Sequence, residues 1–116
     1  MPRRELIPPL KLFGSRTRTS VLILLALLEE SYPSELARLL DARPYTIQTM
    51  VDALEKEGVV ASRTLGRTRR IVLDPRYRAA SELRALLQKL AEFEPRLQDI
   101  AASKRARPRR KGKPLP

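Results

Sequence analysis

Residues 33–58, PSELARLLDARPYTIQTMVDALEKEG, contain two helical patterns separated by a short turn at residues 41–43. Pro33 and Pro44 each begin a run of helix-forming residues. Proline is favoured in the first helical turn because the amide hydrogen that it lacks would have no partner there. Gly58 follows the second run and suits the left-handed conformation that ends many helices. The stretch therefore predicts a helix-turn-helix.

The flanking sequence adds a helix before this unit and a hairpin after it. The first helix is expected to begin near Ser15 or Thr17, both good N-cap residues, and to run through the longest apolar run of the chain. Residues 59–65 and 69–73 are rich in strand-forming types and enclose a turn that contains Gly66. This pattern is typical of a β-hairpin.

This order of elements predicts a mainly α fold with a small β-hairpin, namely a winged helix-turn-helix followed by a long C-terminal helix that begins near residue 76. On this basis the chain divides into four segments. They are an N-terminal arm at 1–14, the winged helix-turn-helix DNA-binding domain at 15–75, a C-terminal helix at 76–102 that is expected to dimerise, and a basic, disordered tail at 103–116.

Three stretches resemble the ArsR-like winged-helix transcriptional regulators. They are LFGSRTR at 12–18, SELARLL at 34–40 and TIQTMVDALEKEGVV at 46–60, and the resemblance extends over about residues 12–90. It implies a winged-helix fold and a DNA-binding role in the regulation of transcription. The chain departs from the metal-sensing members of that family because it has no cysteine and no histidine, so metal sensing is not expected.

The absence of two residue types excludes several kinds of chemistry. Without cysteine the chain has no disulfide, no thiolate metal ligand and no thiol nucleophile. Without histidine it has no imidazole metal ligand and no Ser-His-Asp triad. The four glycines are too far apart in the sequence to form a phosphate-binding loop. We therefore expect neither an enzyme nor a bound cofactor.

The 116-residue chain carries a net charge of +11, from 24 basic and 13 acidic residues. Such a surplus favours a polyanionic partner, nucleic acid before an anionic membrane surface. The charge is unevenly placed, because residues 61–78 hold six basic and one acidic residue and residues 103–116 hold seven basic residues and no acidic one. Residues 15–60 have a net charge of −2. The hairpin and the tail are therefore predicted to supply affinity, and uncharged side chains to supply sequence preference.

The second helix of the helix-turn-helix is expected to be the recognition helix, since this element lies in the major groove in helix-turn-helix proteins. Its buried face is predicted to comprise Ile47, Met50, Val51 and Leu54. Its predicted DNA contacts are Arg43, Tyr45, Thr46, Gln48 and Thr49. Of these, Gln48 can bond adenine through its amide and Thr49 can contact a thymine methyl group. The alternative is that they are ordinary surface residues.

Four arginines of the predicted hairpin are expected to contact DNA, and they are Arg63, Arg67, Arg69 and Arg70. Like charges so close together repel one another, and a duplex backbone offsets that repulsion. An arginine at the hairpin tip also suits a narrow minor groove. The alternative is a solvated turn whose arginines pair with neighbouring acids. Only Asp74 lies nearby in the sequence, which favours phosphate contact.

Apolar residues at alternating spacings of four and three follow the hairpin. The predicted dimer contacts among them, here called the C-terminal stripe, are Leu83, Leu86, Leu90, Phe93 and Leu97. This is the heptad spacing of paired helices, and a twofold dimer would bury it while setting two recognition helices on successive major grooves. The alternative is that the stripe packs on the first helix of the same chain. Pro95 means that the helix either kinks or ends near residue 94 and restarts at Pro95.

The sequence therefore predicts a sequence-specific, homodimeric regulator of transcription that binds double-stranded DNA in the cytoplasm, associated with the nucleoid. No membrane span is expected, because the longest apolar run covers only residues 21–28. Two other functions stay open, a non-specific architectural DNA-binding protein and a winged helix that contacts proteins in a nucleic-acid machine. The target sequence, the direction of regulation and any small-molecule effector stay open as well.

Overall fold

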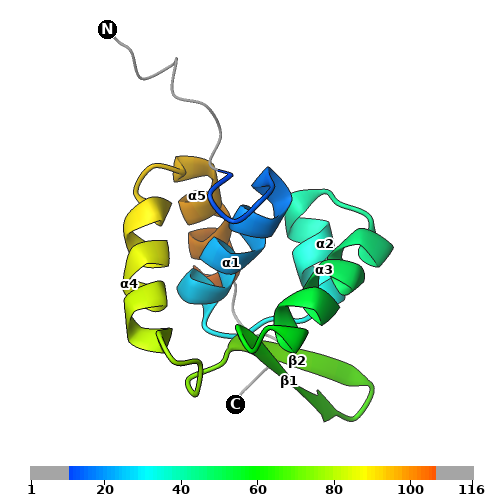
Figure 1. The fold of residues 1–116 in the computed structure, drawn as a ribbon. Coiled ribbons are helices and arrows are strands. Elements are labelled where there is room, and N and C mark those ends of the chain that lie inside the picture. The colour runs from blue at the N-terminus through cyan, green and yellow to red at the C-terminus, as the bar shows by residue number, and fades with distance from the viewer. Residues whose placement is uncertain (1–10, 107–116) are drawn as a thin grey trace, which may run out of the picture.

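The computed structural model of the chain describes residues 11–106, with side chains up to residue 104. Residues 1–10 of the predicted arm and residues 107–116 of the predicted tail lie outside this range. The elements in chain order are α1 (Arg16–Leu28), α2 (Pro33–Leu40), α3 (Pro44–Lys56), β1 (Val60–Leu65), β2 (Thr68–Leu73), α4 (Ala80–Ala91) and α5 (Pro95–Ala106) (Figure 1). The protein is thus mainly helical with one antiparallel hairpin. In the described range no helix has the length and apolar character needed to cross a bilayer.

Helix α1 lies at the centre of the molecule, with helices on both sides of it (Figure 1). Every residue from Thr19 to Ala26 is buried, because α1 contacts α2, β2, α4 and α5 and is apolar on nearly all sides. Ser15, one of the two N-cap residues that the sequence offers, is the N-cap, and its hydroxyl accepts a hydrogen bond of 3.0 Å from the backbone N–H of Arg18.

The stretch from Pro33 to Gly58 forms α2 and α3, and both prolines stand in first helical turns. Asp41 ends α2 in the left-handed conformation, with φ of 54°. Gly58 follows α3 with φ of 82°, where the missing Cβ removes the steric cost of a positive φ. The face of α3 that packs in the core comprises Ile47, Val51 and Leu54, with Met50 partly buried against it.

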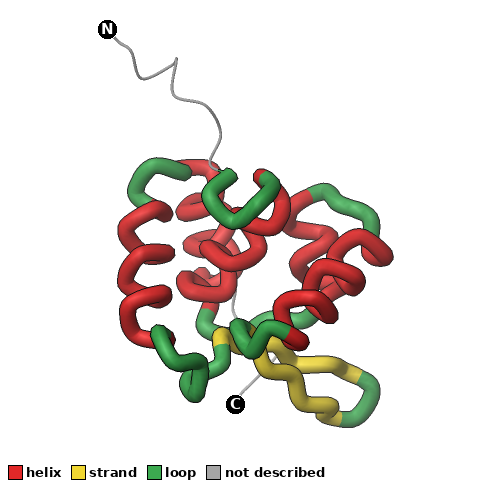
Figure 2. The backbone as a smooth tube through the Cα atoms, viewed as in Figure 1, coloured by secondary structure: helices red, strands yellow, loops and turns green. Residues whose placement is uncertain are grey.

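The hairpin projects from one end of the helical body beside α3 (Figure 2). Its strands pair antiparallel along their full lengths around the two-residue loop Gly66-Arg67. Gly66 has φ of 63°, which a type II′ turn requires of its first central residue. The hairpin is also tied to the connection between α1 and α2, because Ser31 and Ile71 exchange backbone hydrogen bonds of 3.0 and 2.8 Å. These two hydrogen bonds hold the hairpin, and with it the Gly66-Arg67 loop, in place relative to the helices.

The C-terminal segment differs from the single long helix that the heptad spacing predicts. Helix α4 ends at Ala91 and α5 begins with Pro95, which is the second of the two alternatives raised at this proline. The connection closes with a turn in which the N–H of Glu94 donates to the carbonyl of Ala91 at 3.0 Å. A continuous helix is prevented because proline has no N–H and its ring clashes with the preceding turn.

Two boundaries of this segment are also corrected. Helix α4 starts at Ala80, not near residue 76. Residues 75–79 instead form turns, in which the N–H of Tyr77 donates to the carbonyl of Asp74. Helix α5 continues to Ala106, so residues 103–106, predicted as the start of the disordered tail, are helical.

Leu97 is the one member of the C-terminal stripe that is fully buried in the core. It is 1% exposed and lies in the cluster built around α1, together with Leu87 and Ala91, which are outside the stripe and no more than 1% exposed. Leu97 is therefore a core residue of its own chain and cannot contact a second one, which corrects its prediction as a dimer contact. Leu86 and Phe93 stay 40% and 57% exposed, because the core-facing side of α4 is turned by one residue from the predicted stripe.

Candidate nucleic-acid interface

The first half of α3 presents an exposed and mostly uncharged surface. All five predicted contact residues are exposed there, and they are Arg43, Tyr45, Thr46, Gln48 and Thr49. They stay exposed because Ile47 and Val51 hold the opposite face of the helix in the core. Arg43, the N-cap, is the one charged residue of the five. This surface can therefore bind mainly through neutral hydrogen bonds and apolar contact.

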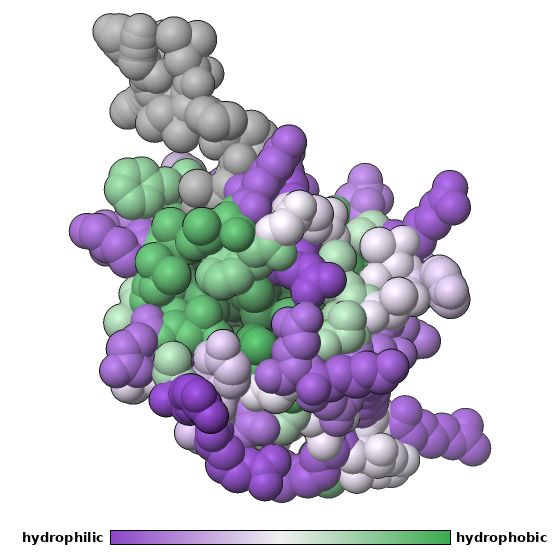
Figure 3. Space-filling view, in the orientation of Figure 1, coloured by the Kyte–Doolittle hydropathy of each residue, from purple (hydrophilic) through white to green (hydrophobic). Residues whose placement is uncertain are grey.

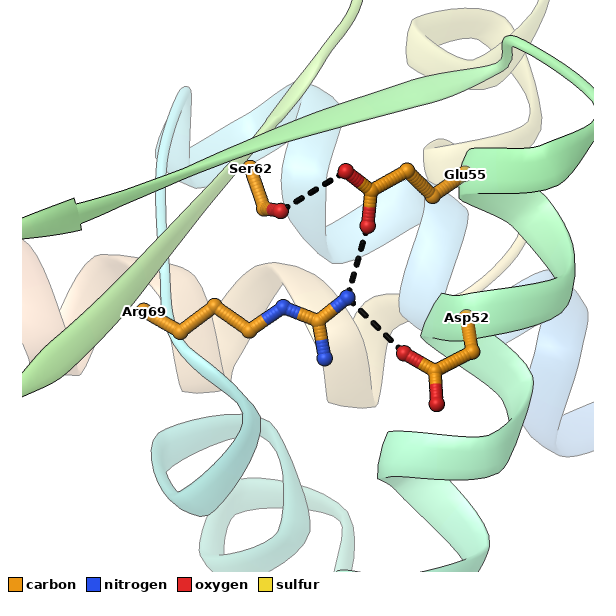
Figure 4. A network of polar contacts seen from close by, with 4 residues as sticks. All are labelled: Asp52, Glu55, Ser62 and Arg69. Carbon is orange, nitrogen blue, oxygen red and sulfur yellow. Dashed lines mark hydrogen bonds and ion pairs between the residues drawn. The ribbon is translucent and has the colours of Figure 1, made fainter.

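The second half of α3 is acidic and is joined to the hairpin. Nη2 of Arg69 lies 2.9 Å from Oδ1 of Asp52 and 2.7 Å from Oε1 of Glu55 (Figure 4). The other oxygen of Glu55 accepts a hydrogen bond of 2.8 Å from the hydroxyl of Ser62. Asp52 and Glu55 meet one guanidinium because residues three apart share a helical face. The network thus connects α3 to both strands.

The same network raises the pKa of Arg69. Partial burial lowers the pKa of Arg69, but the hydrogen bonds to Glu55 and Asp52 outweigh that effect, and the pKa rises above its ordinary value. The single positive charge of the guanidinium faces two carboxylates. Arg69 holds the hairpin against α3, and its charge is already compensated within the protein.

Arg70 has partners of its own on the connection between α1 and α2. Its Nη1 lies 3.6 Å from Oε2 of Glu30. Its guanidinium carbon lies 5.6 Å from the centre of the Tyr32 ring, which is within cation–π range. Like Arg69, it pairs with an acid that is distant in the sequence, so two of the four hairpin arginines have ion-pair partners within the protein.

Asp74, the acid that the sequence places next to the hairpin, pairs outside it. Its Oδ1 accepts hydrogen bonds from Nε of Arg76 at 3.2 Å and from the backbone N–H of Arg76 at 2.9 Å. The side-chain hydrogen bond first and the backbone one second lower the pKa of Asp74. In the described residues Asp74 thus pairs with Arg76, and the acids that pair with hairpin arginines come from α3 and from the connection between α1 and α2.

Two hairpin arginines keep an uncompensated charge. Among residues 11–106 neither Arg63 nor Arg67 has an ion-pair partner, and both are exposed. Arg67 is in the loop at the hairpin tip, and Arg63 lies opposite Arg70 in the ladder. Since like charges directly opposite each other destabilise a strand pair, the contact between Arg70 and Glu30 relieves part of that repulsion.

An open groove of about 310 Å³ runs between the helix-turn-helix and the hairpin tip. Its lining residues are Tyr32, Pro33, Ser34, Gln48, Arg67, Thr68 and Arg69. It therefore joins the start of α2, the exposed face of α3 and the loop of the hairpin. Sequence reasoning missed Tyr32, Ser34 and Thr68, because only the folded chain brings them beside Gln48.

A second surface of the molecule is apolar. Figure 3 shows hydrophobic residues gathered over α1 and α4, whereas the surface over the hairpin is mostly hydrophilic. Leu86 and Phe93 are exposed, and Leu83 and Leu90 are only partly buried. Four members of the C-terminal stripe are thus accessible to a partner, and the fifth, Leu97, is not.

The described residues contain no group of three or more histidine, cysteine, aspartate or glutamate side chains that could hold a metal ion. No protein-family model, curated protein or solved structure matches the chain. The likeness to ArsR-like regulators therefore stays a prediction that depends on the residues alone.

Proposed function

We propose that the protein is a regulator of transcription that binds double-stranded DNA as a homodimer through a winged helix-turn-helix. In this proposal α3 is the recognition helix and the hairpin is the wing. The proposal is supported mainly by one arrangement: the exposed, mostly uncharged start of α3 lies across a groove from the hairpin tip, where Arg67 has no acidic partner among residues 11–106.

In this proposal the α3 side of the groove contacts bases and the hairpin side contacts the DNA backbone. Gln48 and Thr49 face the bases in the major groove, where an amide can bond adenine and a methyl group can contact thymine. Arg63 and Arg67 bind phosphates or the minor groove, where the backbone attracts cations whatever the sequence. Affinity then comes mainly from the hairpin, and sequence preference from α3.

The acidic half of α3 is compatible with this role. Asp52 and Glu55 would repel a phosphate backbone if they were unpaired. Arg69 lies within 2.9 Å of both carboxylates and offsets part of their charge. Asp52 shares a helical face with Gln48 and Thr49, one turn further along α3, so its pairing with Arg69 offsets a negative charge that stands next to the proposed base contacts.

We further propose that a second copy of the chain covers the exposed part of the C-terminal stripe. Leu86 and Phe93 are large apolar side chains left in water, and a twofold axis near α4 would bury both at once. A dimer also pairs two recognition helices with two half-sites on one face of the duplex.

A binding titration tests the DNA-binding role directly. Fluorescence anisotropy of a labelled duplex, measured at low and at physiological salt, should show binding that weakens steeply as salt rises. The charge-reversed variant Arg63→Glu/Arg67→Glu should lose most of it, and Arg96→Glu, an exposed change on α5, should lose little. No binding to any duplex at low salt would contradict the proposal and favour a protein partner. Equal affinity for unrelated duplexes would favour the architectural function.

A further inference from the structure

Tyr32 contacts the hairpin and also lines the groove. It directly precedes α2 as its N-cap and shares the groove lining with Gln48 and Arg67. The guanidinium carbon of Arg70, on β2, lies over its ring at 5.6 Å from the centre. Tyr32 is not among the residues of α3 and the hairpin that are proposed to contact DNA, so the proposed function gives it no role.

The ring of Tyr32 is held by a chain of two contacts. Arg70 lies over its face, and Nη1 of Arg70 lies 3.6 Å from Oε2 of Glu30. The backbone beside these residues is also held, because Ser31 and Ile71 exchange two hydrogen bonds. Since the face of an aromatic ring attracts a cation, the contact with Arg70 favours one orientation of the ring.

The hydroxyl of Tyr32 has no hydrogen-bond partner among residues 11–106. The same is true of the hydroxyls of Ser34 and Thr68 within the described residues, and both line the same groove. Each of the three hydroxyls can donate a hydrogen bond. The groove therefore offers several donors to a ligand that accepts hydrogen bonds.

The groove also favours a negative charge. None of its lining residues is acidic, and Arg67 has no ion-pair partner among residues 11–106. Arg69, the other cation of the lining, is compensated by Asp52 and Glu55. Hydroxyl donors beside an uncompensated arginine match a backbone phosphate, whose charged oxygens accept hydrogen bonds from both kinds of side chain.

We propose that the groove binds one backbone phosphate of the duplex, to which Tyr32 donates a hydrogen bond while Arg67 supplies the positive charge. Arg70 is a positioning residue that acts through the ring of Tyr32, and Glu30 holds Arg70 in place. This inference rests on the proposed DNA-binding function. It adds to that function a DNA contact from the connection between α1 and α2, outside α3 and the hairpin.

A phenol and an arginine that contact the same phosphate differ in their salt dependence. An arginine that neutralises a phosphate releases counterions and so adds to the slope of log K against log salt, whereas a neutral hydroxyl releases none. Tyr32→Phe removes the hydroxyl and keeps the ring beneath Arg70. It should weaken duplex binding about three- to tenfold at every salt concentration, the net value of one hydrogen bond, and leave the slope unchanged.

Anisotropy titrations of a labelled duplex with the full-length chain at four salt concentrations test this contact. Tyr77→Phe is the matched control, because Tyr77 lies in the turns after the hairpin and is not part of the groove lining. It should leave both the affinity and the slope unchanged. Native affinity in the Tyr32→Phe chain would overturn the inference.

The shared phosphate is tested by combining two substitutions. If Tyr32 and Arg67 bind the same phosphate, the loss of one partner lowers the value of the other. The Tyr32→Phe/Arg67→Gln chain should therefore bind at least about twofold more tightly than the product of the two single losses predicts. Full additivity would place the two side chains on different phosphates and overturn the proposal of one shared site.

A second cycle tests the positioning role of Arg70. Glu30→Gln/Arg70→Gln removes one charge of each sign and leaves the net charge of the chain unchanged. It should weaken binding about two- to fourfold, because the phenol must then be ordered when DNA binds, and leave the salt slope unchanged. In the Tyr32→Phe background it should cause no further loss. Equal losses in both backgrounds, or a slope reduced by about 0.9, would overturn the positioning role.

Should the Glu30→Gln/Arg70→Gln chain fail to fold, the comparison of Tyr32→Phe with Tyr77→Phe and the combination with Arg67→Gln decide. Absence of duplex binding by the native chain would refute the proposed function itself. Duplex binding that does not respond to Tyr32→Phe would refute only the phosphate contact of Tyr32.

Discussion

Arg69 of β2 and Glu55 of α3 are in direct contact, with Nη2 of the arginine 2.7 Å from Oε1 of the glutamate. The four hairpin arginines fall into two groups according to whether they pair with an acid of the protein. Arg69 and Arg70 are paired with acids of the protein, and they set the position of the hairpin. Arg63 and Arg67 are exposed, and they are the ones proposed to contact DNA.

The first prediction concerns stability. Arg69→Gln should lower the free energy of unfolding by about 0.5–1 kcal/mol, because it removes contacts to two partly exposed carboxylates. Urea unfolding measures this. The matched control is Arg63→Gln on the neighbouring strand, which should change stability by less than about 0.5 kcal/mol. Equal effects of the two substitutions would show that the network does not hold the hairpin.

The second prediction concerns the salt dependence of DNA binding. Arg67→Gln should reduce the slope of log K against log salt by about 0.9, the value for one phosphate contact. Arg63→Gln should do the same, and Arg69→Gln should change the slope less because its charge is already compensated. Anisotropy titrations at four salt concentrations give the slopes. A larger change for Arg69 than for Arg67 would reverse the assignment of the two groups.

The third prediction concerns sequence preference. Gln48→Ala and Thr49→Ala should each reduce discrimination between the preferred duplex and a substituted one by about 1–3 kcal/mol, while the salt slope stays the same. Competition binding with both duplexes measures the ratio. Gln88→Ala on the exposed side of α4 is the control and should leave discrimination unchanged. A uniform loss on every duplex would assign Gln48 and Thr49 to the backbone.

The fourth prediction concerns the oligomeric state. Leu86→Glu and Phe93→Glu should convert a dimer into a monomer, because a charge buried in an apolar contact is costly without a partner. Leu65→Glu, at an exposed apolar residue of the hairpin, is the control and should remain dimeric. Sedimentation equilibrium gives the masses. A native mass near 13.2 kDa at micromolar concentration would contradict the homodimer.

The fifth prediction concerns acid. Hydrogen bonds from Arg76 lower the pKa of Asp74 in the folded chain, so the charged carboxylate is favoured by folding. The stabilisation it gives is present at neutral pH and is lost as the pH falls below about 4, the ordinary range of aspartate. Urea midpoints at pH 7 and pH 3 should therefore differ less in Asp74→Asn than in the native chain. An unchanged difference would mean that Asp74 does not contribute to acid sensitivity.

The helix ends and the buried face of α3 could be predicted from short stretches of sequence. Pro33, Pro44 and Gly58 mark helix ends because each has its own backbone preference. The spacing of Ile47 and Val51 gave the buried face of α3 correctly, because a helical period needs no knowledge of the partner surface.

The partners of the hairpin arginines could not be predicted in this way. Glu55 is 14 positions from Arg69, and only the packing of α3 on the strands brings them together. The sequence allows a break between α4 and α5 as one of two alternatives, since heptad spacing continues from Phe93 to Leu97 across Pro95. Packing on α1 decides that Leu97 belongs to the core, whereas Phe93 stays exposed.

The most direct test of the central claim is in vitro selection from random duplexes with the full-length chain at two salt concentrations. The account predicts one enriched, roughly palindromic sequence at both salts, with weaker recovery at the higher one. It also predicts that the Gln48→Ala chain enriches that sequence less. Recovery of no enriched sequence at either salt would contradict a sequence-specific regulator and leave at most non-specific binding.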